Sequence, residues 1–189
     1  MNVPLVDLKV NAAPLKADIL AGLGRIIDNC NFILGNEVAE FEKDFASYCN
    51  CSYGVGVANG TDAIHLALRA AGIGPGDEVI IPANTFIATA LGVSYTGAVP
   101  RLVDVDEQTF LIDTKKIAGA ITPRTRAIVP VHLYGRLCDM DAVNEFAQAN
   151  ELLVVEDAAQ AHGAESGGYK AGSSGLAGCF SFYPGKNLG

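Results

Sequence analysis

Short apolar runs alternate with amphipathic stretches along most of the chain, and this alternation restricts its fold more than any other feature. Six runs have the length and composition of buried strands; they occupy residues 53–57, 78–81, 99–103, 127–131, 152–156 and 179–182. Apolar residues at helical spacing fill most of the gaps, at residues 61–71, 86–95, 114–120 and 141–150. Continuous apolar strands joined by helices are typical of a mainly parallel sheet with helices on both faces. The sequence therefore predicts a three-layer α/β fold.

The charge and composition of the chain restrict the partners it can have. Half of its 189 residues are hydrophobic, and 13 basic residues against 21 acidic ones give a net charge of −8. This acidic balance, without a basic stripe, argues against nucleic acid and anionic membrane surfaces as partners. No apolar stretch reaches the roughly 18 residues of a membrane span, and the first residues do not have the layout of a signal peptide. We therefore expect a cytoplasmic protein.

The positions of cysteine and histidine argue against a disulfide framework and a metal site. The cysteines number five, an odd count without a CxxC pair, and Cys49 and Cys51 are too close to form a framework. Free thiols are typical of a reducing compartment, which agrees with the cytoplasm. The three histidines, His65, His132 and His162, are far apart and lack HxxxH spacing, so we expect no metal.

The strongest chemical signal is a lysine that follows the last apolar run. Pro184 and Gly185 break that run, and Lys186 comes directly after the break. A lysine beside an apolar strand end is partly desolvated, so its neutral amine becomes a nucleophile suited to an aldehyde. The run at 152–156 leads to a carboxylate, Asp157. A lysine and a carboxylate at neighbouring strand ends are the two charges that pyridoxal phosphate needs, although an isolated lysine is usually solvated and an aspartate there can simply turn the chain.

Five sequence strings, in one order along the chain, carry a resemblance to a known family. They are GTDA at residues 60–63, PANTFIATA at 82–90, PVHLYG at 130–135, EDAAQAHG at 156–163 and SFYPGKNLG at 181–189. Together they resemble the DegT/StrS family of sugar aminotransferases, from about residue 4 to residue 189. These are pyridoxal-phosphate enzymes of the aspartate-aminotransferase fold. The resemblance implies that residues 1–189 belong to a cofactor-binding large domain of fold type I.

The resemblance assigns the turn before residues 61–71 to the phosphate of the cofactor. Gly60 and Thr61 lie where backbone N–H groups at a helix start attract a phosphate. Ser181 matches the family serine that holds the same phosphate. From the residues alone, Thr61 can equally be the helix cap, and Ser181 a strand residue without a role.

The resemblance also assigns residues to the pyridine ring of the cofactor. Asp157 is expected to keep the ring nitrogen protonated, and Lys186 to bind the aldehyde and later to move a proton as general acid and base. Gln160 matches the glutamine near the phenolic oxygen, and Phe86 matches the aromatic residue that stacks on the ring. Phe86 can alternatively be a core phenylalanine, and the nearby His162 a packing residue.

The activity that the resemblance implies is transfer of an amino group, usually from glutamate, to a nucleotide-linked keto-sugar in amino-sugar biosynthesis. The stretch from Asn84 to Pro100 looks nearer to members that act at sugar carbon 3 than at carbon 4. Two other enzyme classes share parts of these patterns. Related deoxysugar dehydratases have histidine in place of Lys186, and the GxGxxG-like segment at residues 54–60 has its third glycine one residue late for a dinucleotide-binding turn.

The length of the chain departs from the family, whose members continue for about as long again after the lysine. They add the rest of the large domain and a small C-terminal domain, and they form homodimers whose partner subunit completes the cofactor pocket. We therefore expect residues 1–189 to be an incomplete large domain that is catalytically incompetent alone, or a non-catalytic relative. The unpaired edge of the last strand is expected to cause association.

Overall fold

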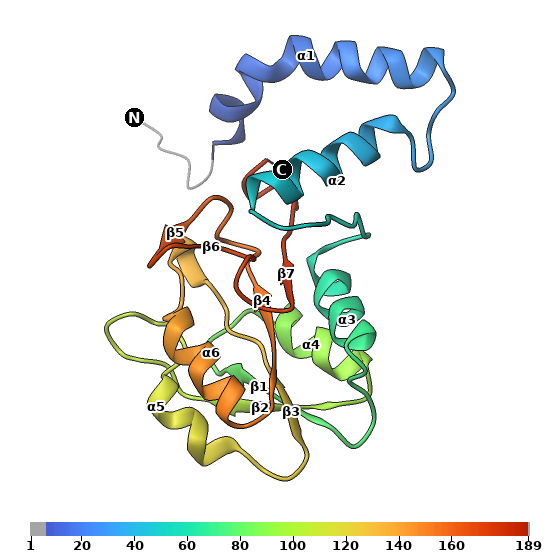
Figure 1. Cartoon of the computed structure of the whole chain (residues 1–189). Helices are drawn as coiled ribbons and strands as arrows, with labels where there is room; N and C mark the ends of the chain where they lie inside the picture. Colours follow the sequence, from blue (N-terminus) through green and yellow to red (C-terminus); the bar gives the residue numbers. More distant parts are fainter. Residues whose placement is uncertain (1–6, 189) are drawn as a thin grey trace.

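The centre of the molecule is a parallel five-stranded sheet, seen in the computed structural model, which describes residues 7–188 (Figure 1). The strand order is β2-β1-β3-β4-β7, and every neighbouring pair is parallel. The strands are β1 (Glu78–Pro82), β2 (Val99–Val103), β3 (Thr125–Ile128), β4 (Leu153–Asp157) and β7 (Ala177–Cys179). A short antiparallel hairpin, β5 (Glu165–Ser166) and β6 (Tyr169–Lys170), lies between β4 and β7 in the sequence. The predicted parallel sheet is confirmed.

Helices cover both faces of this sheet, so the central strands β1, β3 and β4 are mostly buried. On one face, α3 (Gly60–Ala70) and α4 (Ile87–Tyr95) pack over side chains such as Val79 and Ile81. On the other, α5 (Thr114–Ile117) and α6 (Met140–Ala149) pack over a second cluster that includes Ile80. Successive strand residues point to opposite faces, so one strand feeds both cores. The three-layer α/β architecture is confirmed.

Two helices at the start of the chain lie at one end of the molecule, away from the strands (Figure 1). No residue of α1 (Leu8–Asp28) is buried, and its apolar stripe is exposed. α2 (Asn36–Tyr48) packs on the last segment through Phe45, whose ring lies 4.9 Å from that of Phe180 and 5.2 Å from that of Phe182. α2 and the last segment of the described chain therefore meet through an aromatic cluster.

One predicted strand is absent. Residues 53–57 form an irregular segment in which Tyr53 and Val55 are 88% and 80% exposed. The Gly56 N–H donates to Glu42 Oε1 on α2 at 2.6 Å, and a Cβ on Gly54 would collide with the Glu42 backbone. The segment therefore packs against α2 instead of joining the sheet.

The last strand is displaced from its predicted position. β7 ends at Cys179 because its partner β4 ends opposite it, at Asp157. Ser181 thus follows the strand, and its prediction as a strand residue is wrong. Other elements are present with shifted ends; the helix predicted at 114–120 changes after α5 into a 3-10 turn, η1 (Ala118–Ala120).

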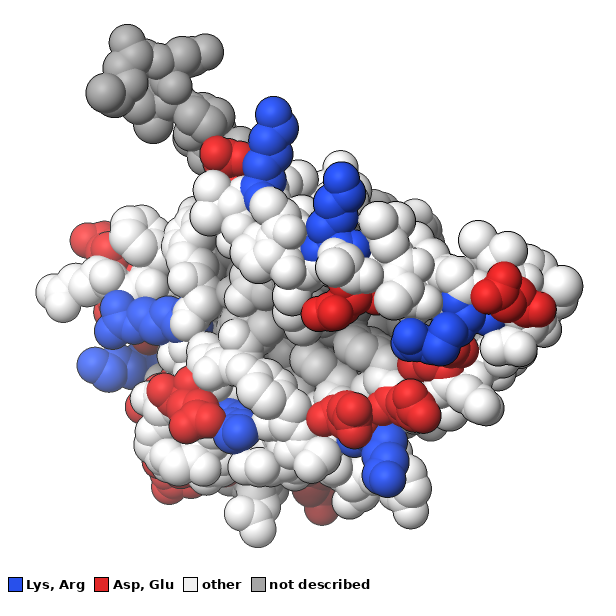
Figure 2. Space-filling view, turned by 90° about the horizontal axis from the view of Figure 1, so that it is seen from above, with Lys and Arg blue, Asp and Glu red and all other residues white. Residues whose placement is uncertain are grey.

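Charged side chains of both signs are interspersed on the face seen in Figure 2, without a region of one sign. This distribution agrees with the absence of a basic stripe in the sequence. Among residues 7–188, no helix is long and apolar enough to cross a membrane.

Candidate active site

Three segments that are far apart in the sequence meet at the carboxyl end of the sheet, where open parallel sheets bind ligands. β4 ends at Asp157 and β7 ends opposite it at Cys179, so the following chain, with Ser181 and Lys186, begins at the same edge. α3 begins against that chain: a Cβ placed on Gly60 would lie 2.9 Å from the Ser181 Cβ. The structure therefore brings together the lysine, the carboxylate and the glycine turn that the sequence singled out.

The start of α3 and Ser181 form a cradle with room for an anion. The helix cap is Asn59, whose Oδ1 accepts the Asp62 N–H at 2.9 Å, so the interpretation of Thr61 as the cap is wrong. The first N–H groups of a helix lack intrahelical partners, and the helix dipole favours negative charge there. The Ser181 hydroxyl accepts the Tyr183 N–H at 3.4 Å and keeps its own proton to donate. The donors and the missing side chain at Gly60 together fit a phosphate group.

Asp157 is a buried carboxylate with one protein donor on each oxygen. It is 6% exposed; its Oδ2 accepts from the Thr89 hydroxyl at 2.6 Å, and its Oδ1 accepts from the Ala159 N–H at 3.2 Å. Burial raises the pKa of Asp157 above its ordinary value, although these bonds and the charge of Lys186 act in the opposite direction. An ionised carboxylate has about four acceptor positions, so capacity remains for a further N–H donor such as a pyridinium.

Lys186 lies within electrostatic reach of the carboxylate. Its side chain is half-buried, in line with its apolar sequence setting, and its charge acts on both Asp157 and His162. Burial lowers the pKa of His162 and outweighs an opposing contribution from the Ser181 backbone, and the positive charge of Lys186 lowers the pKa further. Both ring nitrogens of His162 are buried without a hydrogen-bond partner in the described structure, and the ring packs against Phe180 and Phe182.

Phe86 and Gln160 lie on two loops that border the same edge of the sheet. Phe86 is the N-cap residue of α4 and is 70% exposed, so the alternative of a core phenylalanine is wrong. The Gln160 Oε1 accepts the Tyr134 N–H at 2.9 Å, which ties this side chain to the turn η2 (Leu133–Gly135). Tyr134 has φ of 57°, a left-handed conformation that is uncommon outside glycine.

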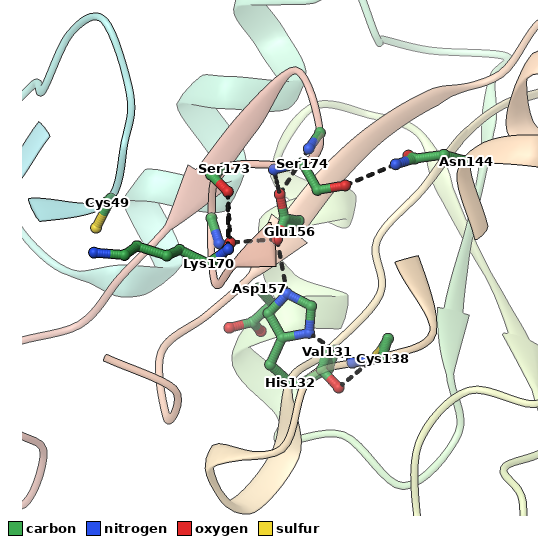
Figure 3. A network of polar contacts seen from close by, with 12 residues as sticks. Cys49, Val131, His132, Cys138, Asn144, Glu156, Asp157, Lys170, Ser173 and Ser174 are labelled. Carbon is green, nitrogen blue, oxygen red and sulfur yellow. Dashed lines mark hydrogen bonds and ion pairs between the residues drawn. The ribbon is translucent and has the colours of Figure 1, made fainter. Parts of the chain in front are cut away.

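The sequence does not reveal a network behind the site, because strand alternation directs Glu156 to the face opposite Asp157. Glu156 is fully buried and accepts from His132 Nε2 and the Gly172 N–H at 2.8 Å, and from the Ser174 and Gly175 N–H groups at 2.7 Å (Figure 3). A carboxylate inside an apolar strand must be paired to be tolerated, and that was the available signal. Thr89 carried no comparable signal.

The His132 side chain is held in one tautomer within this network. Its Nδ1 accepts the Cys138 N–H at 3.2 Å, so its Nε2 carries the proton and donates to Glu156. Burial alone would raise the pKa of Glu156, but the bonds from His132, Gly175 and Gly172 hold it below the ordinary value. The backbone N–H of His132 also donates to the backbone carbonyl of Asp157 at 3.0 Å. The network therefore supports the backbone at the site.

Comparison with known proteins identifies the family. Residues 14–189 match the DegT/DnrJ/EryC1/StrS aminotransferase family. The chain belongs to this family. It is 53% identical over 187 residues to the UDP-N-acetyl-3-dehydro-alpha-D-glucosamine 3-aminotransferase of Acidithiobacillus ferrooxidans, covering 99% of this chain and 51% of that protein. It is 51% identical over 188 residues to the dTDP-3-amino-3,4,6-trideoxy-alpha-D-glucose transaminase of Streptomyces venezuelae, covering 100% of this chain and 50% of the relative.

Solved structures of family members have the same fold. The crystal structure of DesV from S. venezuelae, in complex with a ketimine intermediate, superimposes with a TM-score of 0.94 at 51% identity, over 99% of this chain and 50% of that one. A DegT/DnrJ/EryC1/StrS aminotransferase from Brucella abortus superimposes with a TM-score of 0.95 at 35% identity, over 100% of this chain and 52% of that one. The aspartate-aminotransferase-like fold is thus confirmed, and the chain spans about half the length of the relatives it matches.

Proposed function

We propose that this chain supplies the cofactor-binding part of a pyridoxal-phosphate-dependent aminotransferase that acts on a nucleotide-linked keto-sugar. The observation that carries the proposal is the close approach of Gly60 to Ser181 at the start of α3, at the edge where Asp157 and Lys186 lie. A phosphate cradle, a lysine and a buried carboxylate are the three features that the phosphate, aldehyde and ring nitrogen of this cofactor require. When bound, the cofactor supplies an electron sink for the bond changes at the amino-bearing carbon.

The residues of the chain orient the cofactor. The N–H groups of Gly60 and Thr61 and the Ser181 hydroxyl hold the phosphate, and Asp157 accepts the ring N–H. Phe86, exposed beside the site, stacks on the ring. Gln160, already fixed by the bond from Tyr134, lies near the phenolic oxygen.

Lys186 has two functions in this proposal. Its amine would hold the cofactor through the aldehyde carbon and, when free, would take the proton from the donor α-carbon as general base and give it up again as general acid. Its half-buried side chain lies where its charge acts on Asp157, so the amine and the carboxylate can serve the same bound ring. A histidine at this position cannot make the same covalent bond, so the lysine favours amino transfer over the dehydratase alternative.

The substrates follow from the relatives. The A. ferrooxidans and S. venezuelae proteins are named for amino groups at sugar carbon 3, and we assign the same carbon of a nucleotide-linked 3-keto-sugar to this protein, with glutamate as donor. We further propose a cytoplasmic homodimer in which residues 1–189 are part of the large domain and the partner subunit completes the pocket. The chain alone is then expected to be inactive.

The test compares the 189-residue chain with a fusion in which these residues precede the second half of the A. ferrooxidans relative. Amino transfer from glutamate to a nucleotide 3-keto-sugar is measured for both proteins. The fusion is expected to turn over and the chain to be inactive, while Lys186→Ala abolishes transfer by the fusion and the exposed-lysine control Lys115→Ala leaves it unchanged. Retained transfer in the Lys186→Ala fusion would refute the proposed role of the lysine.

A further inference from the structure

The carboxylate of Asp157 is tied to α4 by a chain of two hydroxyl groups. Thr89 is fully buried, and its Oγ1 lies 2.6 Å from Asp157 Oδ2 and 2.7 Å from Thr85 Oγ1. An ionised carboxylate only accepts hydrogen bonds, and a hydroxyl has one proton to donate. Thr89 therefore donates to Asp157, and Thr85 must donate to Thr89. The hydrogen bonds run in one direction, from Thr85 through Thr89 to the carboxylate.

The same turn of α4 carries the exposed Phe86 side chain. The Thr89 N–H donates to the Phe86 carbonyl at 3.1 Å, so the two side chains are held in one fixed turn. Phe86 lies on its outer side, and Thr89 reaches inward to the carboxylate. A single local structure thus couples the position of the aromatic ring to that of Asp157.

Few other groups compensate the charge of Asp157. Against the effect of burial, the side chains of His132 and Lys186 lower the pKa of Asp157. The pKa of the Cys179 thiol on β7 is raised by burial and, in turn, by Asp157. Of the two direct protein donors, the Thr89 hydroxyl at 2.6 Å is closer than the Ala159 N–H at 3.2 Å. Donation to a carboxylate favours its ionised form, with the largest effect in a buried setting.

We propose that Thr89 is a positioning residue for Asp157: its hydroxyl, supported by Thr85, holds the buried carboxylate ionised and aligned with the ring nitrogen of pyridoxal phosphate. This inference rests on the proposed function, in which Asp157 accepts the ring N–H. Thr89 itself touches neither the cofactor nor the substrate. Its effect is therefore specific to the ring nitrogen and separate from phosphate and aldehyde binding.

The first measurement needs no cofactor. The carboxyl carbon of Asp157 is titrated by ¹³C NMR in the cofactor-free chain, with Asp157→Asn to assign the signal. Thr89→Val keeps the shape of the side chain and removes the hydroxyl, and it is expected to raise the titration midpoint by about one pH unit or more, since bonds to charged groups are the strong ones. Thr89→Ser is expected to restore the midpoint. Thr96→Val is the matched control, because Thr96 is a buried threonine at the other end of α4 that bonds to Val93 and Ala98 instead.

The second measurement separates the ring nitrogen from the rest of the cofactor. Dissociation constants are measured in the fusion for pyridoxal phosphate and for its analogue with carbon in place of the ring nitrogen. At a pH below both midpoints, binding must first ionise Asp157. There Thr89→Val is expected to weaken pyridoxal phosphate binding about tenfold, the factor that corresponds to one pH unit, and to change binding of the analogue less than about twofold. If Thr89 had a merely structural role, its replacement would weaken the binding of both compounds equally.

The outcomes distinguish this inference from the proposed function. A raised titration midpoint together with weaker binding of pyridoxal phosphate, but not of the analogue, supports both the positioning role and the proposed function. An unshifted midpoint, or equal weakening of the two compounds, in a fusion that binds both overturns the role of Thr89 alone. If the unmodified fusion binds neither compound, the proposed function fails, and the positioning role fails with it.

Discussion

Replacing Glu156 by glutamine tests the network behind the site. The carboxylate is fully buried and accepts four hydrogen bonds, two on each oxygen. Glutamine keeps one oxygen, so one pair of donors then faces an NH₂ group that cannot accept. Each buried donor left without a partner costs about 1–3 kcal/mol. Two donors lose their partner, so we expect Glu156→Gln to lower the free energy of unfolding by about 3 kcal/mol.

The assay is urea unfolding of the chain, with thermal unfolding alongside. At this length about 3 kcal/mol corresponds to a fall in Tm of roughly 6–12 °C, with an unchanged urea m-value if the native state stays compact. Glu165→Gln is the control, because Glu165 is exposed and, among residues 7–188, forms an ion pair only with Lys170, at 3.3 Å. A surface pair of this kind contributes less than about 1 kcal/mol.

The pH dependence of this difference is a second check. The pKa of Glu156 in the folded chain lies below the ordinary value of 4.5, so its stabilisation is present above pH 4.5 and is lost as the pH falls through the folded-state pKa. The difference in the free energy of unfolding between the unmodified chain and Glu156→Gln is therefore expected to shrink in acid. A Glu156→Gln variant as stable as Glu165→Gln at neutral pH would refute the reasoning.

Two further outcomes are expected at the site itself. Gly60→Ala places a methyl group 2.9 Å from the Ser181 Cβ, so it is expected to weaken pyridoxal phosphate binding to the fusion at least tenfold. The control Gly119→Ala meets no atom within 4 Å and is expected to change this affinity less than twofold. Equal affinities of the two variants would remove the cradle from the site. Burial raises the pKa of Asp157 from the ordinary 3.8, so this group's stabilisation is full below pH 3.8 and is lost as the pH rises through the raised value. Asp157→Asn is thus expected to become more stable relative to the unmodified chain as the pH rises, in urea unfolding without cofactor, and a constant difference would contradict this.

The sheet could be predicted from the sequence because its central strands, β1, β3 and β4, are mostly buried on both faces. Val79, Ile80 and Ile81 supply both cores from one strand, and such runs are recognisable without knowledge of their neighbours. Residues 53–57 have a similar composition, yet they form no strand, because Gly54 and Gly56 lie against Glu42 of α2. Composition alone does not say which backbone a glycine approaches.

The site was predictable only in part. Strings around Lys186 and Asp157 identified the two charges, and the resemblance named Gly60, Thr61 and Ser181 for the phosphate. How closely α3 approaches Ser181 is a tertiary distance, which the residues alone do not give. Thr89 and Glu156 were missed for related reasons. Thr89 acts on a residue 68 positions away in the sequence, and Glu156 bonds to a loop 16–19 positions further on, so neither contact follows from local pattern.

The most direct test of the central claim is to map the lysine that holds the cofactor. The fusion is incubated with pyridoxal phosphate, reduced with borohydride and digested, and the modified peptide is identified by mass spectrometry. The account expects one phosphopyridoxyl group, on Lys186, and its loss in Lys186→Ala without transfer to another lysine. A fusion that is folded and labelled mainly at other lysines, or not labelled at all, would contradict it.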